Sequence, residues 1–128
     1  MTTAAQLRSR YAREAVTTAS PARLVTMLYD RLSRDLDDAE SAICRTDPQA
    51  AHRALRHAQD IVQELSVSLD VARWPDGKSL QGLYTWLVGQ LVTANLTKDA
   101  SLVISCREIV DPLREAWHAA ANVHGVAS

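Results

Sequence analysis

Apolar residues recur at every third or fourth position in four stretches of the chain, and short polar segments separate the stretches. The first stretch carries Leu24, Leu28, Leu32, Leu36, Ala39 and Ile43, and the second carries Ala51, Leu55, Ala58, Val62, Leu65 and Leu69. The third carries Leu80, Leu83 or Tyr84, Leu87, Leu91 and Ala94, and the fourth carries Leu102, Cys106, Ile109, Leu113, Trp117 and Ala120. Because a helix turns once in about 3.6 residues, each set lies on one helix face. The pattern predicts four amphipathic helices, at about residues 20–45, 48–70, 79–96 and 98–123.

Residues that start and stop helices stand between these stretches. Ser20 and Asp47 each stand directly before a proline. Their side-chain oxygens can accept hydrogen bonds from the free amides at the start of a helix, and proline is favoured in the first helical turn. Pro-Asp-Gly77 is typical of a turn. Short connections favour antiparallel packing of neighbouring helices. The sequence therefore predicts an all-α fold, an antiparallel four-helix bundle over residues 20–124, with a short, partly mobile N-terminal cap segment over residues 1–19.

Pro112 stands inside the fourth stretch. A proline in a helix interior removes one backbone hydrogen bond and costs about 3 kcal/mol relative to alanine. We expect a kink there rather than a stop, because the apolar rhythm continues on both sides.

The composition agrees with a bundle that has an aliphatic core. Hydrophobic residues make up 47% of the 128 residues, with three Trp, three Tyr and no Phe. The formal net charge of −1 gives no electrostatic basis for binding nucleic acid or an anionic membrane. No apolar run reaches the roughly 18 residues of a membrane span, and the N-terminus lacks the pattern of a secretory signal. We therefore expect a cytoplasmic protein with no nucleic-acid partner and no membrane insertion, whose Cys44 and Cys106 are reduced thiols.

The sequence carries no complete catalytic or metal-binding motif. Glu115-Ala-Trp-His118 has the Glu-x-x-His spacing of a di-iron site, but no second such pair exists. His57 suits a phosphorelay poorly, because Asp60 lies one turn away and would repel a phosphate. No nucleophile elbow and no phosphate-binding loop occur. We expect no enzymatic activity, no metal and no cofactor.

The third predicted helix differs from the others because residues 79–96 contain no charged side chain. A helix of that length extends about 27 Å. Trp86, Val88, Val92 and Leu96 lie partly off its core stripe. One interpretation is a docking groove for a partner helix or for a second copy of the chain. The other is a more deeply buried helix that the N-terminal segment covers, and both can hold if a partner displaces that segment.

Five segments, in this order along the chain, resemble one family, the flagellin-specific export chaperones (the FliS family). They are Tyr11 with residues 16–30, residues 58–70, Leu83-Tyr84, residues 94–99 and residues 113–117. The resemblance implies an antiparallel four-helix bundle with an N-terminal cap, no cofactor and no catalysis. It also implies a client, the disordered C-terminal segment of flagellin, which the chaperone holds in the cytosol to prevent early polymerisation. A component of the flagellar type III export gate is the implied recipient.

The resemblance assigns binding roles to Tyr11 and to the surfaces of the second and third helices. We add apolar residues of the N-terminal segment and two outward residues of the uncharged helix. The expected partner-binding set is Leu7, Tyr11, Val16, Ile61, Leu65, Leu69, Leu83, Tyr84, Trp86, Leu87, Val88 and Leu91. We expect residues 1–18 to cover part of the groove in the free protein and to move when flagellin binds. The alternative is a self-associating structural bundle, a homodimer whose seam is the third helix.

Overall fold

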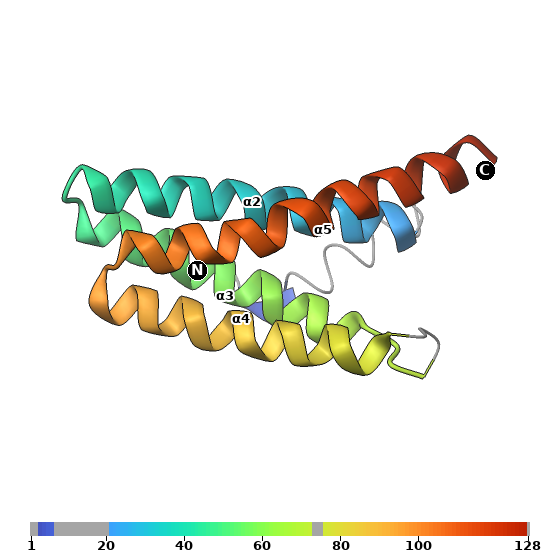
Figure 1. Ribbon diagram of the computed structural model, residues 1–128, viewed down its shortest axis with the longest axis horizontal. Coiled ribbons are helices and arrows are strands. Elements are labelled where there is room, and N and C mark those ends of the chain that lie inside the picture. Colours follow the sequence, from blue (N-terminus) through green and yellow to red (C-terminus); the bar gives the residue numbers. More distant parts are fainter. Residues whose placement is uncertain (1–2, 7–20, 73–75, 128) are drawn as a thin grey trace.

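Four long helices follow one another along the chain: α2 (Pro21–Cys44), α3 (Pro48–Ser68), α4 (Gly77–Thr97) and α5 (Ala100–Ala127). The structure is a computed structural model that describes residues 3–6, 21–72 and 76–127. Neighbouring helices run antiparallel (Figure 1), and the described residues include no strand. The expected all-α helical bundle is thus confirmed.

The turns between helices are built from local polar contacts. At the start of α3, the Asp47 side chain accepts a hydrogen bond from the amide of Ala50 at 3.1 Å, and Pro48 occupies the first turn. At the end of α4, Lys98 adopts a left-handed conformation with φ 52°, which closes the helix. Asp99 then accepts a hydrogen bond from the amide of Ser101 at 2.9 Å, next to the start of α5.

The helices form a ring in which each has two neighbours. α2 packs against α3 and α5, and α4 packs against the same two helices from the other side. The diagonal pairs, α2 with α4 and α3 with α5, do not pack directly. The buried core contains Leu28, Leu32, Leu36, Leu55, Ile61, Val62, Leu87, Leu91, Val103, Cys106 and Val110.

The core-facing side of α5 differs slightly from the expected one. Val103 and Val110 are fully buried, whereas the expected Leu102 and Ile109 are only half-buried. On both sides of Cys106 the buried position is thus one residue later in the chain than expected, while Cys106 itself is buried as expected. The cause is that both α2 and α4 flank α5, so apolar residues on either side of the buried line also gain partial cover.

α5 continues as a helix through Pro112 to Ala127. Its C-terminal half leans toward α2 and away from α4 (Figure 1). α5 accordingly packs more extensively against α2 than against α4. The contact between α4 and α5 is the least extensive of the four contacts between helices.

Candidate functional site: the uncharged surface of α4

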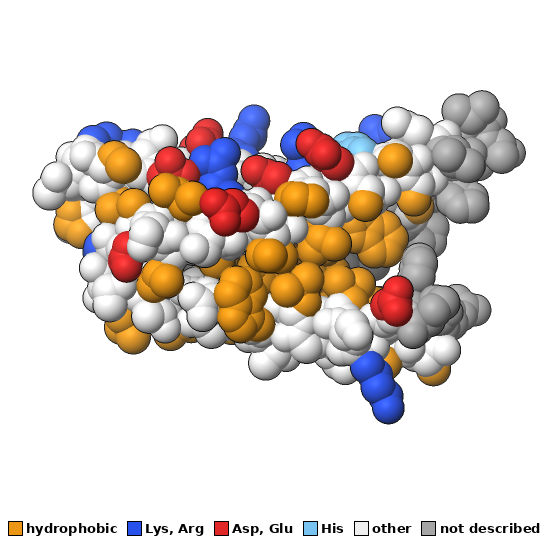
Figure 2. Space-filling model, in the orientation of Figure 1, with side chains coloured by type: hydrophobic (Ala, Val, Ile, Leu, Met, Phe, Trp, Pro, Cys, Tyr) orange, Lys and Arg blue, Asp and Glu red, His pale blue; other side chains and the backbone are white. Residues whose placement is uncertain are grey.

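α4 presents solvent with a surface that has no charge over most of its length. Between Lys78 and Lys98 no residue is charged. In Figure 2, charged side chains gather over α2 and α5, whereas the half of this face formed by α4 shows charges only near its ends. An ordinary amphipathic helix of a bundle carries charged side chains on its outer face, so α4 is exceptional within this chain.

Large apolar side chains are exposed on α4. In the described part of the chain, five large hydrophobic residues are exposed, and three of them, Trp86, Val92 and Leu96, belong to α4. Leu96 is 81% exposed, Trp86 42% and Val92 39%. The exposed residues around them are small or uncharged. We call this set the α4 surface; it consists of Gly82, Thr85, Trp86, Gly89, Val92, Thr93 and Leu96.

The hydroxyl groups of the α4 surface are used within the helix itself. Thr85 donates to the carbonyl of Gln81 at 3.1 Å, and Thr93 donates to the carbonyl of Gly89 at 3.1 Å. A side-chain hydroxyl that bonds four residues back offers its methyl group to the outside. Thr85 and Thr93 therefore make the α4 surface more apolar than two threonines with free hydroxyl groups would.

The structure divides the expected partner-binding residues into groups. Ile61, Leu65, Tyr84, Leu87 and Leu91 are all buried in the core. These five side chains stabilise the bundle in this structure, and their part in binding a partner stays a prediction.

Four further members of that set lie nearer the surface. Leu69, Leu83 and Val88 are half-buried against the core, and Trp86 is exposed. The remaining three, at positions 7, 11 and 16, lie outside the described residues.

Val92 and Leu96 were left out of the expected set, although both lie on the α4 surface. The sequence already carries a signal for Leu96. It stands five positions after Leu91, which places it about 140° around the helix from a residue of the core stripe. The sequence already placed Val92 and Leu96 partly off the core stripe, so position on the helical wheel separates both from the core.

An aromatic cluster joins α2, α4 and α5 inside the bundle. The hydroxyls of Tyr29 and Tyr84 are 2.8 Å apart, and both side chains are buried. The ring of Trp117 lies 6.3 Å from that of Tyr29, between centroids. Burial raises the pKa of Tyr29 and of Tyr84, so both hydroxyls stay protonated. The cluster is a structural support for α4 rather than a reactive site.

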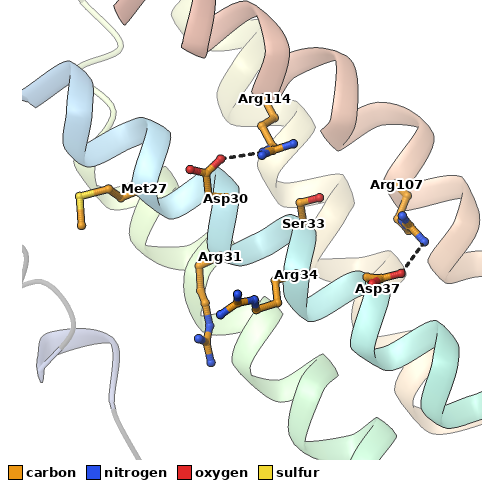
Figure 3. A pocket seen from close by; sticks show the side chains of 8 residues that line it. All are labelled: Met27, Asp30, Arg31, Ser33, Arg34, Asp37, Arg107 and Arg114. Atoms are coloured by element: carbon orange, nitrogen blue, oxygen red, sulfur yellow. Dashed lines mark hydrogen bonds and ion pairs between the residues drawn. The ribbon is translucent and has the colours of Figure 1, made fainter.

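A hollow lies between α2 and α5, and its lining is polar (Figure 3). Arg114 pairs with Asp30 at 2.6 Å, and Arg107 pairs with Asp37 at 3.3 Å. His118, from the Glu-x-x-His motif, contacts the same Asp30 oxygen at 2.6 Å. These contacts tie α5 to α2 through ion pairs and hydrogen bonds.

No metal centre or membrane helix is found where the chain is described. Among those residues no three His, Cys, Asp or Glu side chains lie close enough to hold a metal ion. His57 pairs with the buried Asp35 and is half-buried. None of the helices in the described ranges has both the length and the apolar character to cross a membrane.

Comparison with known proteins identifies the family. The family model for "Flagellar protein FliS" matches residues 3–124. The flagellar secretion chaperone FliS of Bacillus subtilis is 30% identical over 107 residues, which cover 84% of this chain and 80% of that protein.

Two enterobacterial relatives carry the same name, flagellar secretion chaperone FliS. The protein of Salmonella typhimurium is 30% identical over 105 residues, covering 80% of this chain and 78% of the relative. That of Escherichia coli is 32% identical over 105 residues, covering 80% and 77%. These relatives are named as chaperones rather than enzymes. With nearly the whole bundle inside the match, the chain belongs to the FliS family of flagellar proteins.

Proposed function

We propose that this protein is a cytoplasmic export chaperone for flagellin, and that the α4 surface holds the C-terminal segment of flagellin. One observation carries the proposal: α4 has no charged residue between Lys78 and Lys98, yet it leaves Trp86, Val92 and Leu96 exposed. Exposed apolar surface of this kind is typical of a binding site. Relatives that are named flagellar secretion chaperones support a role in flagellar export.

A disordered client suits this surface. A flagellin tail that becomes helical on docking would lay apolar residues, three or four positions apart, along α4. Burial contributes about 25 cal/mol for each Å² of apolar surface removed from water. Ordering the tail costs about 2–5 kcal/mol of that gain. Binding thereby withholds the tail from other flagellin subunits, while the ordering cost keeps the complex releasable at a component of the export gate.

The proposal is tested by capturing flagellin with and without its tail. We expect the immobilised chaperone to retain full-length flagellin and to lose flagellin that lacks the C-terminal segment. The two flagellins share the rest of their surface, so the difference isolates the tail. Equal retention of both, or of neither, would contradict the proposed client site.

The N-terminal segment remains part of the proposal. Apolar residues at positions 7, 11 and 16 support a cover over part of the α4 surface in the free protein, which flagellin displaces. A cover lowers the apparent affinity by the fraction of time for which the site is open. Hydrogen exchange of residues 1–18 tests this. Exchange at the random-coil rate both with and without flagellin would show that the segment neither covers nor binds.

The second candidate function is a structural bundle that associates through α4 and carries no client. The observation that favours it is the regular spacing of Gly82, Gly89 and Leu96, seven positions apart, along the α4 surface. A constitutive dimer that ignores flagellin supports this candidate, and a complex with one flagellin per chaperone supports the first.

A further inference from the structure

In the described part of α5, Ile104 is the one large hydrophobic side chain that is exposed, at 42%. It lines a hollow of about 470 Å³, between α5 and α2, that is distinct from the one drawn in Figure 3. We call it the Ile104 hollow; its lining residues are Glu40, Ile104, Arg107, Glu108, Asp111 and Pro112. None of them belongs to α4, so the hollow is separate from the α4 surface.

Pro112 gives this hollow an unusual backbone. Proline has no amide hydrogen, so the carbonyl of Glu108, four residues earlier, lacks the donor that a helix normally supplies. The helix nevertheless continues through Pro112. Glu108 and Pro112 are both exposed, so this carbonyl lies on the solvent-facing side of α5. Ile104, Glu108 and Pro112 stand four positions apart and share that side. An acceptor without its helical partner therefore lies beside exposed apolar surface.

The charges of the Ile104 hollow leave an excess of acid. Its lining contains one arginine and three carboxylates, which gives a formal charge of −2. Arg107 is held by Glu40 of α2 at 2.7 Å, and Asp111 accepts a hydrogen bond from Ser33 at 3.2 Å. Glu108 forms no ion pair with any residue that the structure describes. Its carboxylate and its carbonyl are thus both available to a partner.

A basic side chain has the chemistry that this hollow lacks. The methylene groups of an arginine can cover the apolar side chains of Ile104 and Pro112, while the charged end stays at the polar edge. The guanidinium carries five N–H donors in a planar fork, so it can reach the carboxylate and the carbonyl of Glu108 together. An acidic side chain would be repelled, and an apolar one would leave the carbonyl without a donor.

We propose that the Ile104 hollow is a docking site for an arginine side chain of a partner protein. The proposal does not depend on the α4 surface or on its occupant. Where the proposed chaperone function holds, a protein that receives the loaded chaperone needs a surface that the flagellin tail leaves uncovered. The Ile104 hollow meets that need, because it shares no residue with the α4 surface.

Nuclear magnetic resonance titration of the full chain with N-acetylarginine methylamide tests the proposal. We expect saturable shifts of the backbone amides between positions 104 and 113, with a dissociation constant on the order of 1 mM for a ligand this small. N-acetylcitrulline methylamide is the matched control ligand, because it has the same stem and an uncharged end. It should bind at least about fivefold more weakly.

Two variants separate the acceptors of Glu108. Glu108→Gln removes the charge and keeps the shape, so the dissociation constant should rise about fivefold or more. Pro112→Ala restores the amide that pairs with the carbonyl of Glu108, so the constant should rise about threefold while the melting temperature also rises. Glu115→Gln is the control, because Glu115 is an exposed acid of α5 outside the hollow, and it should leave the constant unchanged.

Shifts that fail to saturate, or a citrulline ligand that binds as tightly as the arginine ligand, overturn the proposal. So does a dissociation constant that Glu108→Gln and Pro112→Ala both leave unchanged while circular dichroism shows a folded bundle. Because flagellin is absent, none of these results bears on the chaperone function, which the capture experiment with truncated flagellin tests separately.

Discussion

Tyr29 of α2 and Tyr84 of α4 bring their hydroxyl oxygens to 2.8 Å across the diagonal of the bundle. These two helices do not otherwise pack directly against each other. Both side chains are buried, and Trp117 of α5 hydrogen-bonds to Tyr29 as well. Three helices therefore meet at one small polar cluster inside an apolar core.

Tyr84→Phe should destabilise the bundle by about 1 kcal/mol, because it removes a buried hydrogen bond and keeps the ring. Urea unfolding of Tyr84→Phe, Tyr29→Phe and the double variant measures the effect. If the two hydroxyls bond to each other, the double variant costs less than the sum of the single variants. Strictly additive costs would show that the two hydroxyls do not interact.

The same tyrosines make the fold sensitive to alkaline pH. Burial raises the pKa of each above its ordinary value near 10, so the folded state disfavours the phenolate. Their contribution to stability is present below about pH 10 and is lost as the pH rises further. We expect phenolate absorbance from Tyr29 and Tyr84 to appear together with the loss of helicity. Ionisation of both in a fully helical protein would contradict this.

The two cysteines should react at very different rates. Cys106 is buried, and burial raises the pKa of its thiol to about 11, whereas Cys44 is exposed. A thiol reagent at neutral pH should label Cys44 first and Cys106 only on unfolding, with peptide mapping as the measurement. Cys44 is the internal control for reagent activity. Equal rates in the native protein would mean that the buried side of α5 is wrongly oriented.

Asp30 should contribute a small stabilisation that disappears in acid. Burial alone would raise its pKa, but hydrogen bonds from His118 and Arg114, together with their charges, lower it below the ordinary value. The stabilisation is present above about pH 4 and is lost as the pH falls through the lowered pKa. The side chain is 44% exposed, so solvent screening limits the cost of Asp30→Asn to about 0.5 kcal/mol at pH 7.

Thermal unfolding of Asp30→Asn and of the wild type at pH 7 and at pH 3 measures this difference. Asp38→Asn is the control, because Asp38 is an exposed acid on the same helix. A difference between Asp30→Asn and the wild type that is undiminished at pH 3 would show that the effect comes from packing rather than from charge.

Much of the fold was predictable from the sequence because its signals are local. The apolar spacing of the first three stretches and residues such as Asp47 act within a few positions, and the helix that follows Asp47 begins at Pro48. Contacts between distant residues carry no such signal. Tyr29 and Tyr84 stand 55 positions apart, and Asp30 and Arg114 stand 84 apart. Neither pair could be chosen from the sequence over other pairs of the same type.

The candidate site was predicted as a helix with outward apolar residues, but only two of them, Trp86 and Val88, entered the expected binding set, and Val92 and Leu96 did not. The absence of charge pointed to α4, and that same absence removed the polar residues that normally mark the solvent side of a helix. Leu87 and Leu96 are the same type of residue, yet Leu87 is 1% exposed and Leu96 is 81% exposed. The predicted core stripe, which contains Leu87 and not Leu96, separates the two, and the packing of α3 and α5 against α4 agrees with it.

The binding of the flagellin tail to the α4 surface is the central claim, and calorimetric titration with a peptide of the C-terminal segment of flagellin tests it most directly. We expect one peptide to bind per chaperone. Trp86→Lys and Leu96→Lys should each weaken binding about tenfold or more, because each places a charge in an apolar contact. Ile104→Lys adds the same charge to an exposed apolar residue of α5 and should leave the affinity unchanged. A wild-type chain that binds no peptide, or α4 variants that bind as tightly as the wild type while their helicity is intact, would contradict the claim.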